Sequence, residues 1–156
     1  MMEQISIRAA KEADIGALCR LLEQVCSTHA DIRPDIFRAG AKKYTQAELS
    51  GILKDANTPV FVATIKENVA GYIFCMMQKA GNATKQNTLY VDDLCVDASI
   101  RGKGIGKKLF DYACAYAKEQ GCYNVTLHVW AGNESAEAFY AKQGMQTQKT
   151  CLEKIL

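Results

Sequence analysis

The feature that most constrains this chain is a glycine-rich loop between an expected strand and an expected helix. Aromatic and β-branched residues predict a strand that ends at Val96, and glycines follow at positions 102, 104 and 106. Glycine lets a ligand approach the backbone, and the first turn of a helix presents unpaired N–H groups at its positive dipole end. Cationic side chains surround the loop: Arg101, Lys103, Lys107 and Lys108. The stretch therefore predicts a site for a phosphorylated ligand.

Two common phosphate-binding loops do not fit this stretch. Both the Walker loop and the dinucleotide fingerprint require a glycine where this chain has Lys107. The pattern Arg101-x-x-Gly104-x-Gly106, after a strand that ends Leu94-Cys95-Val96, instead resembles the acetyl-CoA pyrophosphate loop of the GCN5-related N-acetyltransferases. A glycine-rich turn without a ligand is the alternative, and the alternating glycines with their flanking cations argue against it.

The resemblance implies that acetyl-CoA is the co-substrate. The expected cofactor contacts are Leu94, Cys95, Val96, Arg101, Gly102, Lys103, Gly104, Ile105, Gly106, Lys107, Asn133 and Tyr140. In the family, the strand with residues 94–96 splays from the strand with residues 127–130. The pantetheine arm then pairs with the freed backbone groups at 94 and 96. Asn133 also fits a plain helix N-cap. Cys95 has no histidine nearby in sequence to activate it as a nucleophile, so a small apolar strand residue is the favoured interpretation.

Direct attack on a thioester requires a neutral amine, so the acceptor must lose a proton. Family members often have an acidic residue near Asp92, which is the expected base. Asp93, expected on the opposite strand face, and His128 are the alternatives. The segment Asn133-x-x-Ala136-x-x-Phe139-Tyr140 resembles the family's second motif and implies that Tyr140 protonates the departing CoA sulfur. A half-buried packing role for Tyr140 is the alternative.

The expected function is acetyl transfer from acetyl-CoA to a primary amine, by direct attack through a ternary complex. The alternative is a non-catalytic domain that binds or senses acyl-CoA. The motifs do not identify the amine, and a polyamine, an amino acid, an antibiotic amine and a protein N-terminus stay open. We expect residues 33–44 and 130–132 to determine the acceptor.

The periodicity along the chain predicts one domain, residues 1–156, with element order βααβββαβαβ. This order fits an α/β fold in which a mixed, twisted, mostly antiparallel sheet is flanked by helices, as in the family. Asp14 is expected to cap the first helix, and Thr45 with Glu48 predicts a capping box for the second. A strand is expected at Val125–Trp130, and a last strand at Gln146–Lys154.

Composition limits the expected partners and location. A net charge of +2 is too small to indicate nucleic-acid binding, and no run approaches the roughly 18 apolar residues of a membrane helix. The chain does not start like a signal peptide. Its cysteines form an odd set of seven without a C-x-x-C pair, which favours reduced thiols in the cytoplasm over disulfides or a metal site. Related domains form homodimers through C-terminal strands, and Cys151–Leu156 is apolar enough to take part.

Overall fold

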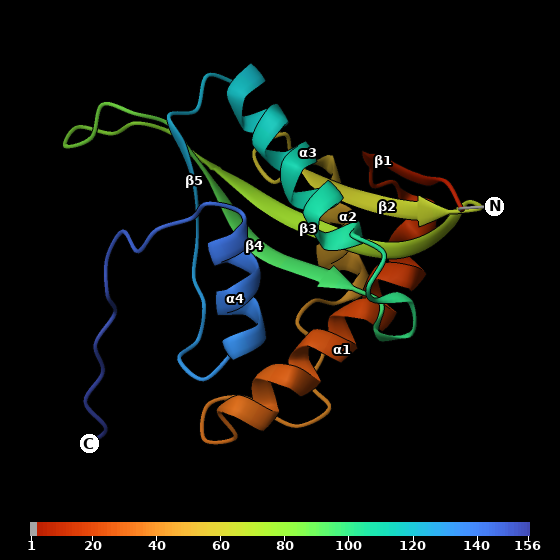
Figure 1. Ribbon diagram of the computed structural model, residues 1–156, viewed down its shortest axis with the longest axis horizontal. Coiled ribbons are helices and arrows are strands. Elements are labelled where there is room, and N and C mark those ends of the chain that lie inside the picture. Colours follow the sequence, from red (N-terminus) through yellow and green to blue (C-terminus); the bar gives the residue numbers. More distant parts are fainter. Residues whose placement is uncertain (1–2) are drawn as a thin grey trace.

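The computed structural model describes residues 3–156, so residues 1 and 2 of the expected domain lie outside the described residues. The described residues form a five-stranded sheet in the order β1-β2-β3-β4-β5 (Figure 1). Its strands are β1 (Ile5–Ala9), β2 (Val60–Ile65), β3 (Asn68–Gln78), β4 (Thr88–Val96) and β5 (Asn124–Leu127). The first four strands are antiparallel, and β5 is parallel to β4. The mixed, mostly antiparallel α/β sheet predicted from the sequence is therefore confirmed.

Helices cover both faces of this sheet (Figure 1). On one face, α1 (Ile15–Ile32) and α2 (Gln46–Lys54) pack their buried leucines against β2, β3 and β4. On the other face, α3 (Ile105–Glu119) packs against the same strands. The helix α4 (Glu134–Lys142) follows β5 and lies near the start of α3. No helix among residues 3–156 has the length and apolar character needed to cross a membrane.

The two expected helix caps have different outcomes. Thr45 accepts a hydrogen bond from the Glu48 N–H, and the Glu48 side chain accepts one from the Thr45 N–H, so the capping box is confirmed. Asp14 stands at the N-cap of α1 but makes no side-chain cap bond, so that prediction is wrong. Its carboxylate instead accepts two hydrogen bonds from Arg8 and one from the Lys11 N–H. A bidentate arginine attracts the carboxylate more strongly than a backbone N–H does.

Gly71 in β3 allows a close approach to β4. A Cβ atom at this position would lie 2.7 Å from the Cys95 carbonyl oxygen and 3.2 Å from a methyl group of Leu109. The first contact involves backbone that cannot move without disturbing the strand. Only glycine therefore lets β3 pack this closely against the end of β4 and against α3.

The C-terminal part of the sheet is smaller than the sequence predicts. The fifth strand ends at Leu127 rather than Trp130, and Gln146–Lys154 forms no strand within the described structure, so these two predictions are wrong. A strand requires a neighbour that pairs with its backbone. Residues 146–154 pair with no strand of the described sheet, and the segment runs to Leu156 without regular structure (Figure 1).

Candidate active site

A β-bulge in β4 determines where the two adjacent acidic residues point. Asp93 is opposite Phe74 and Val91 is opposite Cys75, so Asp92 is an extra residue between two consecutive pairs. The extra residue interrupts the alternation of side chains. Val91 and Leu94 both pack toward α3, and Asp92 and Asp93 both turn toward the α1 face. The prediction that the two carboxylates lie on opposite faces is therefore wrong.

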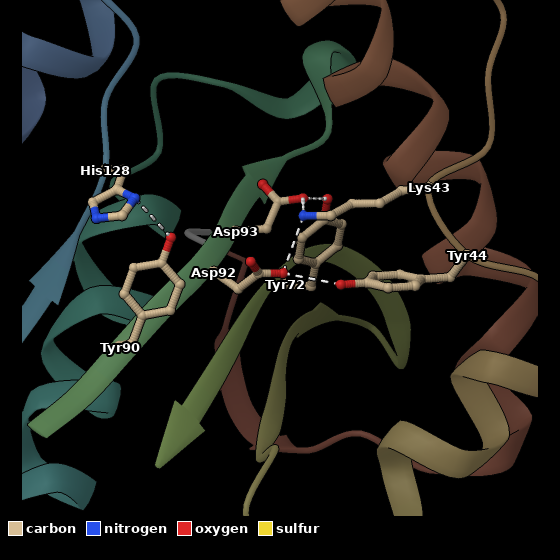
Figure 2. Close-up of polar contacts among 7 residues, drawn as sticks. All are labelled: Lys43, Tyr44, Tyr72, Tyr90, Asp92, Asp93 and His128. Atoms are coloured by element: carbon tan, nitrogen blue, oxygen red, sulfur yellow. Dashed lines mark hydrogen bonds and ion pairs between the residues drawn. The ribbon is translucent and has the colours of Figure 1, made fainter. Parts of the chain in front are cut away.

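Figure 2 shows both carboxylates directed toward Lys43. The Asp92 Oδ2 atom accepts hydrogen bonds from the Lys43 ammonium at 3.0 Å and from the Tyr44 hydroxyl at 3.0 Å. The Asp93 Oδ2 atom accepts one from the Tyr72 hydroxyl at 2.8 Å and lies 4.0 Å from Lys43 Nζ. The site thus combines two strand carboxylates with groups from β3 and from the segment between α1 and α2.

Burial distinguishes the two carboxylates. The Asp92 side chain is 23% exposed, whereas that of Asp93 is 8% exposed. Burial raises the pKa of the Asp93 carboxyl above its usual range, although Lys43 and the Tyr72 hydroxyl oppose the shift. Burial also raises the pKa of Tyr44, to about 12, so its hydroxyl keeps its proton at neutral pH. Asp92 is reachable from solvent, and Asp93 is held beneath it.

Beyond these carboxylates, β4 separates from β5. The two strands pair only from Thr88 with Asn124 to Val91 with Leu127. The N–H of Asp97 donates to the Ala70 oxygen on the β3 side. Because backbone groups alternate along a strand, those of Leu94 and Val96 point the other way, into the gap beside β5. This is the splayed geometry that the resemblance implies for the pantetheine arm, and binding of that arm stays a prediction.

The glycine-rich loop connects the end of β4 to α3. Gly102 and Gly104 have left-handed backbones, with φ of 88° and 73°. The N–H of Lys108 donates to the Gly104 oxygen, so the N–H groups of residues 105–107 precede the hydrogen-bonded ladder of α3. Lys103 pairs with Glu3 and Lys107 with Asp111, and these partners reduce the positive charge available to a ligand.

The first cation of the loop lies beside α1. Arg101 donates to the Val96 oxygen at 3.4 Å, and with Arg20 of α1 it lines a groove of about 540 Å³. Gln24 of α1 accepts a hydrogen bond from the Ala98 N–H and fixes this helix against the loop. Arg20 has no motif of its own in the sequence, and only the helix packing reveals that it stands beside Arg101.

The α4 segment faces the start of α3. The Asn133 side chain accepts a hydrogen bond from the Ala136 N–H, which confirms its N-cap role. Phe139 lies against Gly106, where a Cβ atom would approach the ring to 3.4 Å. Tyr140 instead packs its ring against Phe110, with ring centres 5.8 Å apart. Burial and the Asp93 carboxylate raise the pKa of Tyr140, so its hydroxyl is a proton donor at neutral pH.

Cys95 and His128 are also candidates from the sequence, and the structure shows the surroundings of each. Cys95 is 4% exposed, its thiol points toward the Leu21 oxygen, and burial raises its pKa to about 12. The thiol is therefore protonated at neutral pH and a poor nucleophile. His128 is exposed and faces Tyr90, whose hydroxyl lies 3.3 Å from the Nδ1 atom, rather than the carboxylates (Figure 2). The role of His128 as an alternative base stays a prediction.

The two segments expected to determine the acceptor lie against each other. Phe37 packs edge-on against Trp130 with ring centres 5.4 Å apart, and the Arg33 guanidinium lies over the same indole. Arg33 also pairs with Glu153 of the C-terminal segment at 2.6 Å.

Sequence reasoning missed Lys43, Tyr44 and Tyr72, because no spacing rule links them to residues about twenty to fifty positions away on β4.

The model of the acetyltransferase (GNAT) family matches residues 22–145. The chain belongs to this family. Members of the GNAT family use acetyl-CoA as co-substrate. A thialysine N-ε-acetyltransferase of Bos taurus is 26% identical over 153 residues, which cover 93% of this chain and 86% of that protein.

Other GNAT relatives match this chain over a smaller share of their own length. An uncharacterized N-acetyltransferase of Methanocaldococcus jannaschii is 28% identical over 108 residues, or 69% of this chain and 48% of that protein. A glucosamine 6-phosphate N-acetyltransferase of Arabidopsis thaliana is 29% identical over 97 residues, or 60% of this chain and 63% of that protein. This chain thus spans about half to two thirds of the length of these two relatives.

Solved structures share the GNAT fold over the whole chain. A variant of the BH1408 protein of Bacillus halodurans has a TM-score of 0.90 and 30% identity, covering 97% of this chain and 99% of that one. The aminoglycoside N-acetyltransferase AAC(6')-Iy in complex with CoA has a TM-score of 0.78. It is 14% identical and covers 100% of this chain and 97% of that chain, a likeness that shows the fold alone.

If the glycine-rich loop holds the CoA pyrophosphate, Gly104→Val weakens CoA binding roughly tenfold or more, about 1.4 kcal/mol. A Cβ atom at Gly104 would point into open space on the ligand side of the loop, where a branched side chain keeps the phosphates from the backbone. Calorimetric titration with CoA measures the change.

Gly121→Val is the matched control, because Gly121 has a similar φ of 77° and the same open surroundings at the far end of α3. The two variants share the backbone strain, and only Gly104 adjoins the expected phosphate site. Equal CoA affinities for the two folded variants would remove the phosphate-loop interpretation.

Proposed function

We propose that this chain transfers the acetyl group of acetyl-CoA to a primary amine, by direct attack within a ternary complex. The observation that carries the proposal is the gap between β4 and β5, which has the glycine-rich loop at one end and the Asp92–Asp93 pair at the other. A thioester in that gap would lie between phosphate-binding backbone and a carboxylate that attracts an ammonium ion. The family and the N-acetyltransferase relatives support this arrangement.

Asp92 is the proposed base. It is the more exposed carboxylate, and both of its hydrogen-bond donors reach the same oxygen, Oδ2. Its other oxygen, Oδ1, is thus left to accept a hydrogen bond from the incoming ammonium. Proton removal then produces the neutral amine, whose lone pair attacks the thioester carbonyl carbon. Asp93 lies on the same face and is the alternative acceptor of that proton.

Tyr140 is the proposed acid. When the tetrahedral intermediate collapses, the carbon–sulfur bond breaks and the sulfur takes the electron pair. A phenol within reach protonates the resulting thiolate. The raised pKa of Tyr140 keeps that proton available across the neutral range. The aromatic packing of the ring against Phe110 and Phe139 fixes where the hydroxyl points.

The acceptor amine can belong to any of the classes that the sequence leaves open: a polyamine, an amino acid, an antibiotic amine or a protein N-terminus. The names of the relatives specify thialysine and glucosamine 6-phosphate as acceptors of those proteins, and both are amines. A panel of polyamines, amino acids, aminoglycosides and peptides with free N-termini, assayed by release of the CoA thiol, tests the proposal. A chain that binds acetyl-CoA but turns over with none of these classes is the non-catalytic domain instead.

The remaining expectations on location and partners stay predictions. All seven cysteines are free, with Cys75 and Cys95 buried and Cys151 exposed. Free thiols are consistent with a cytoplasmic location. The single domain over residues 1–156 and the lack of nucleic-acid binding are likewise predictions.

We also propose a homodimer that uses the C-terminal segment. Leu152 is 88% exposed and Ile155 76% exposed. Such apolar side chains are costly in water, and the outer edge of β5 offers backbone groups that a strand from a second copy can pair with. Light scattering at micromolar concentration is expected to give twice the mass of one chain, and Leu152→Asp with Ile155→Asp to give a single chain. A monomeric wild-type protein would contradict the dimer.

Asp92→Asn is expected to lower the acetyl-transfer rate by about 10²-fold or more at neutral pH. The defect shrinks toward the pKa of the amine, near ~10.4 for a lysine-like acceptor, because free amine then needs no base. The pH–rate profile of kcat/KM measures this. Asp31→Asn, on the exposed side of α1, is the control and keeps the wild-type profile. A wild-type profile for Asp92→Asn would transfer the role to Asp93, His128 or ordered water.

Tyr140→Phe is expected to lower the single-turnover rate of acetyl transfer by about 10²–10⁴, or roughly 3–5 kcal/mol of barrier. The ring that packs on Phe110 is kept, so folding and the acetyl-CoA Kd hardly change. A single-turnover assay is needed because slow product release can hide the chemical step.

Tyr116→Phe is the matched control. Tyr116 of α3 is a partly buried tyrosine that packs against Phe61 of β2, away from the acidic pair. If Tyr140→Phe transfers acetyl within about twofold of Tyr116→Phe, the thiolate leaves unaided and Tyr140 only packs.

A further inference from the structure

Lys43 brings a positive charge to the acidic pair from a distant part of the chain. Its Nζ atom lies 3.0 Å from Asp92 Oδ2 and 4.0 Å from Asp93 Oδ2. Within residues 3–156, no other lysine or arginine forms an ion pair with either carboxylate. The Lys43 side chain is 33% exposed, so water screens these attractions less than on an open surface. Figure 2 shows the ammonium next to both carboxylates, at the point where the bulge turns them to one face.

The acidic pair needs this compensation. Two neighbouring carboxylates on one strand face repel each other, and burial of the Asp93 side chain disfavours its charged form. The hydroxyls of Tyr44 and Tyr72 each donate a hydrogen bond, which favours the carboxylates without supplying a net charge. Lys43 alone among these partners offsets the like-charge repulsion.

We propose that Lys43 is a positioning residue whose ammonium opposes protonation of the buried Asp93 and holds the Asp92 carboxylate in place, so that a base is ready at neutral pH. The inference rests on the proposed function, because it places the carboxylates at the acceptor end of the acetyl-transfer site. Lys43 acts through them and does not itself touch the reacting atoms. A carboxylate that has taken up a proton from solvent could not accept one from the amine.

Burial and the ion pair act in opposite directions on the pKa of Lys43 and of Asp93. Burial opposes the charge on Lys43, but Asp93 and Asp92 outweigh it and raise the pKa of the ammonium. Burial raises the pKa of Asp93, and Lys43 counters it most strongly among the neighbouring groups. The titratable groups that face Asp93 from β3, β4, α1, α4 and the α1–α2 segment are Tyr72, Asp92, Cys95, Cys26, His29, Tyr140, Lys43 and Tyr44.

Two other basic residues could compete with Lys43 as the compensating charge. Burial lowers the pKa of His29, so this imidazole is mainly neutral at pH 7. Lys42, the next residue in the chain, points elsewhere and pairs with Glu23 at 3.8 Å, with 73% of its side chain exposed. Lys43 itself does not serve as an internal acetyl acceptor in its ion-paired state, because its raised pKa holds the proton that a nucleophilic amine must lose.

The test is a carboxyl titration by NMR on the full chain with ¹³C-labelled aspartate, where Asp93→Asn assigns the Asp93 signal. We expect the Asp93 titration to move to higher pH in Lys43→Met and to return toward the wild-type position in Lys43→Arg. Lys42→Met is the matched control and should titrate as wild type. The acid limb of the kcat/KM profile is expected to move up by about 1–3 pH units in Lys43→Met alone.

Circular dichroism and the acetyl-CoA Kd check that each variant is folded, and Lys43→Gln replaces Lys43→Met if the latter is not. An Asp93 titration in the folded variant that coincides with wild type would overturn the inference. So would an equal shift in Lys42→Met, since that result indicates only the overall charge of the protein. If the titration moves as expected but the wild type acetylates no amine, the coupling through Lys43 is supported and the proposed function fails.

Discussion

The extra residue in β4 is the constraint on which the rest of the site depends. Without it, alternation along the strand would place one of the two carboxylates in the apolar layer beneath α3: Asp92 if Leu94 stays on that face, or Asp93 if Val91 does. A carboxylate there would be buried without a partner, at a cost of several kcal/mol. The bulge places the charge on the α1 face instead, where donors from other segments reach it.

The bulge also lies where β4 and β5 stop pairing. Their last paired residues are Val91 and Leu127, and the extra residue follows immediately. Bulges bend the strand that contains them and increase its twist. One local irregularity thus accounts for both the same-sided carboxylates and the backbone groups at 94 and 96 that are free of β5.

The sequence predicts best what is encoded within a few residues. The glycine-rich loop, the Thr45 capping box and the Asn133 cap each rest on neighbours within four positions, and the structure has these local features. The failures involve partners that the sequence does not bring together. The contact from Lys43 to Asp92 spans 49 positions, and whether residues 146–154 form a strand depends on a neighbouring edge rather than on their own pattern. Asp14 failed for the same reason, because Arg8 of β1 competes for its carboxylate.

The ion pair between Arg33 and Glu153 has a practical consequence for handling the protein. Arg33 belongs to the segment that reaches the acidic pair through Lys43 and Tyr44, whereas Glu153 lies three residues before Leu156. An affinity tag fused after Leu156, or a truncation that removes Glu153, would therefore disturb the ion pair that joins the C-terminal segment to residues 33–44. Kinetic constants from tagged preparations should accordingly be compared with those of the untagged chain, and an amino-terminal fusion avoids this contact.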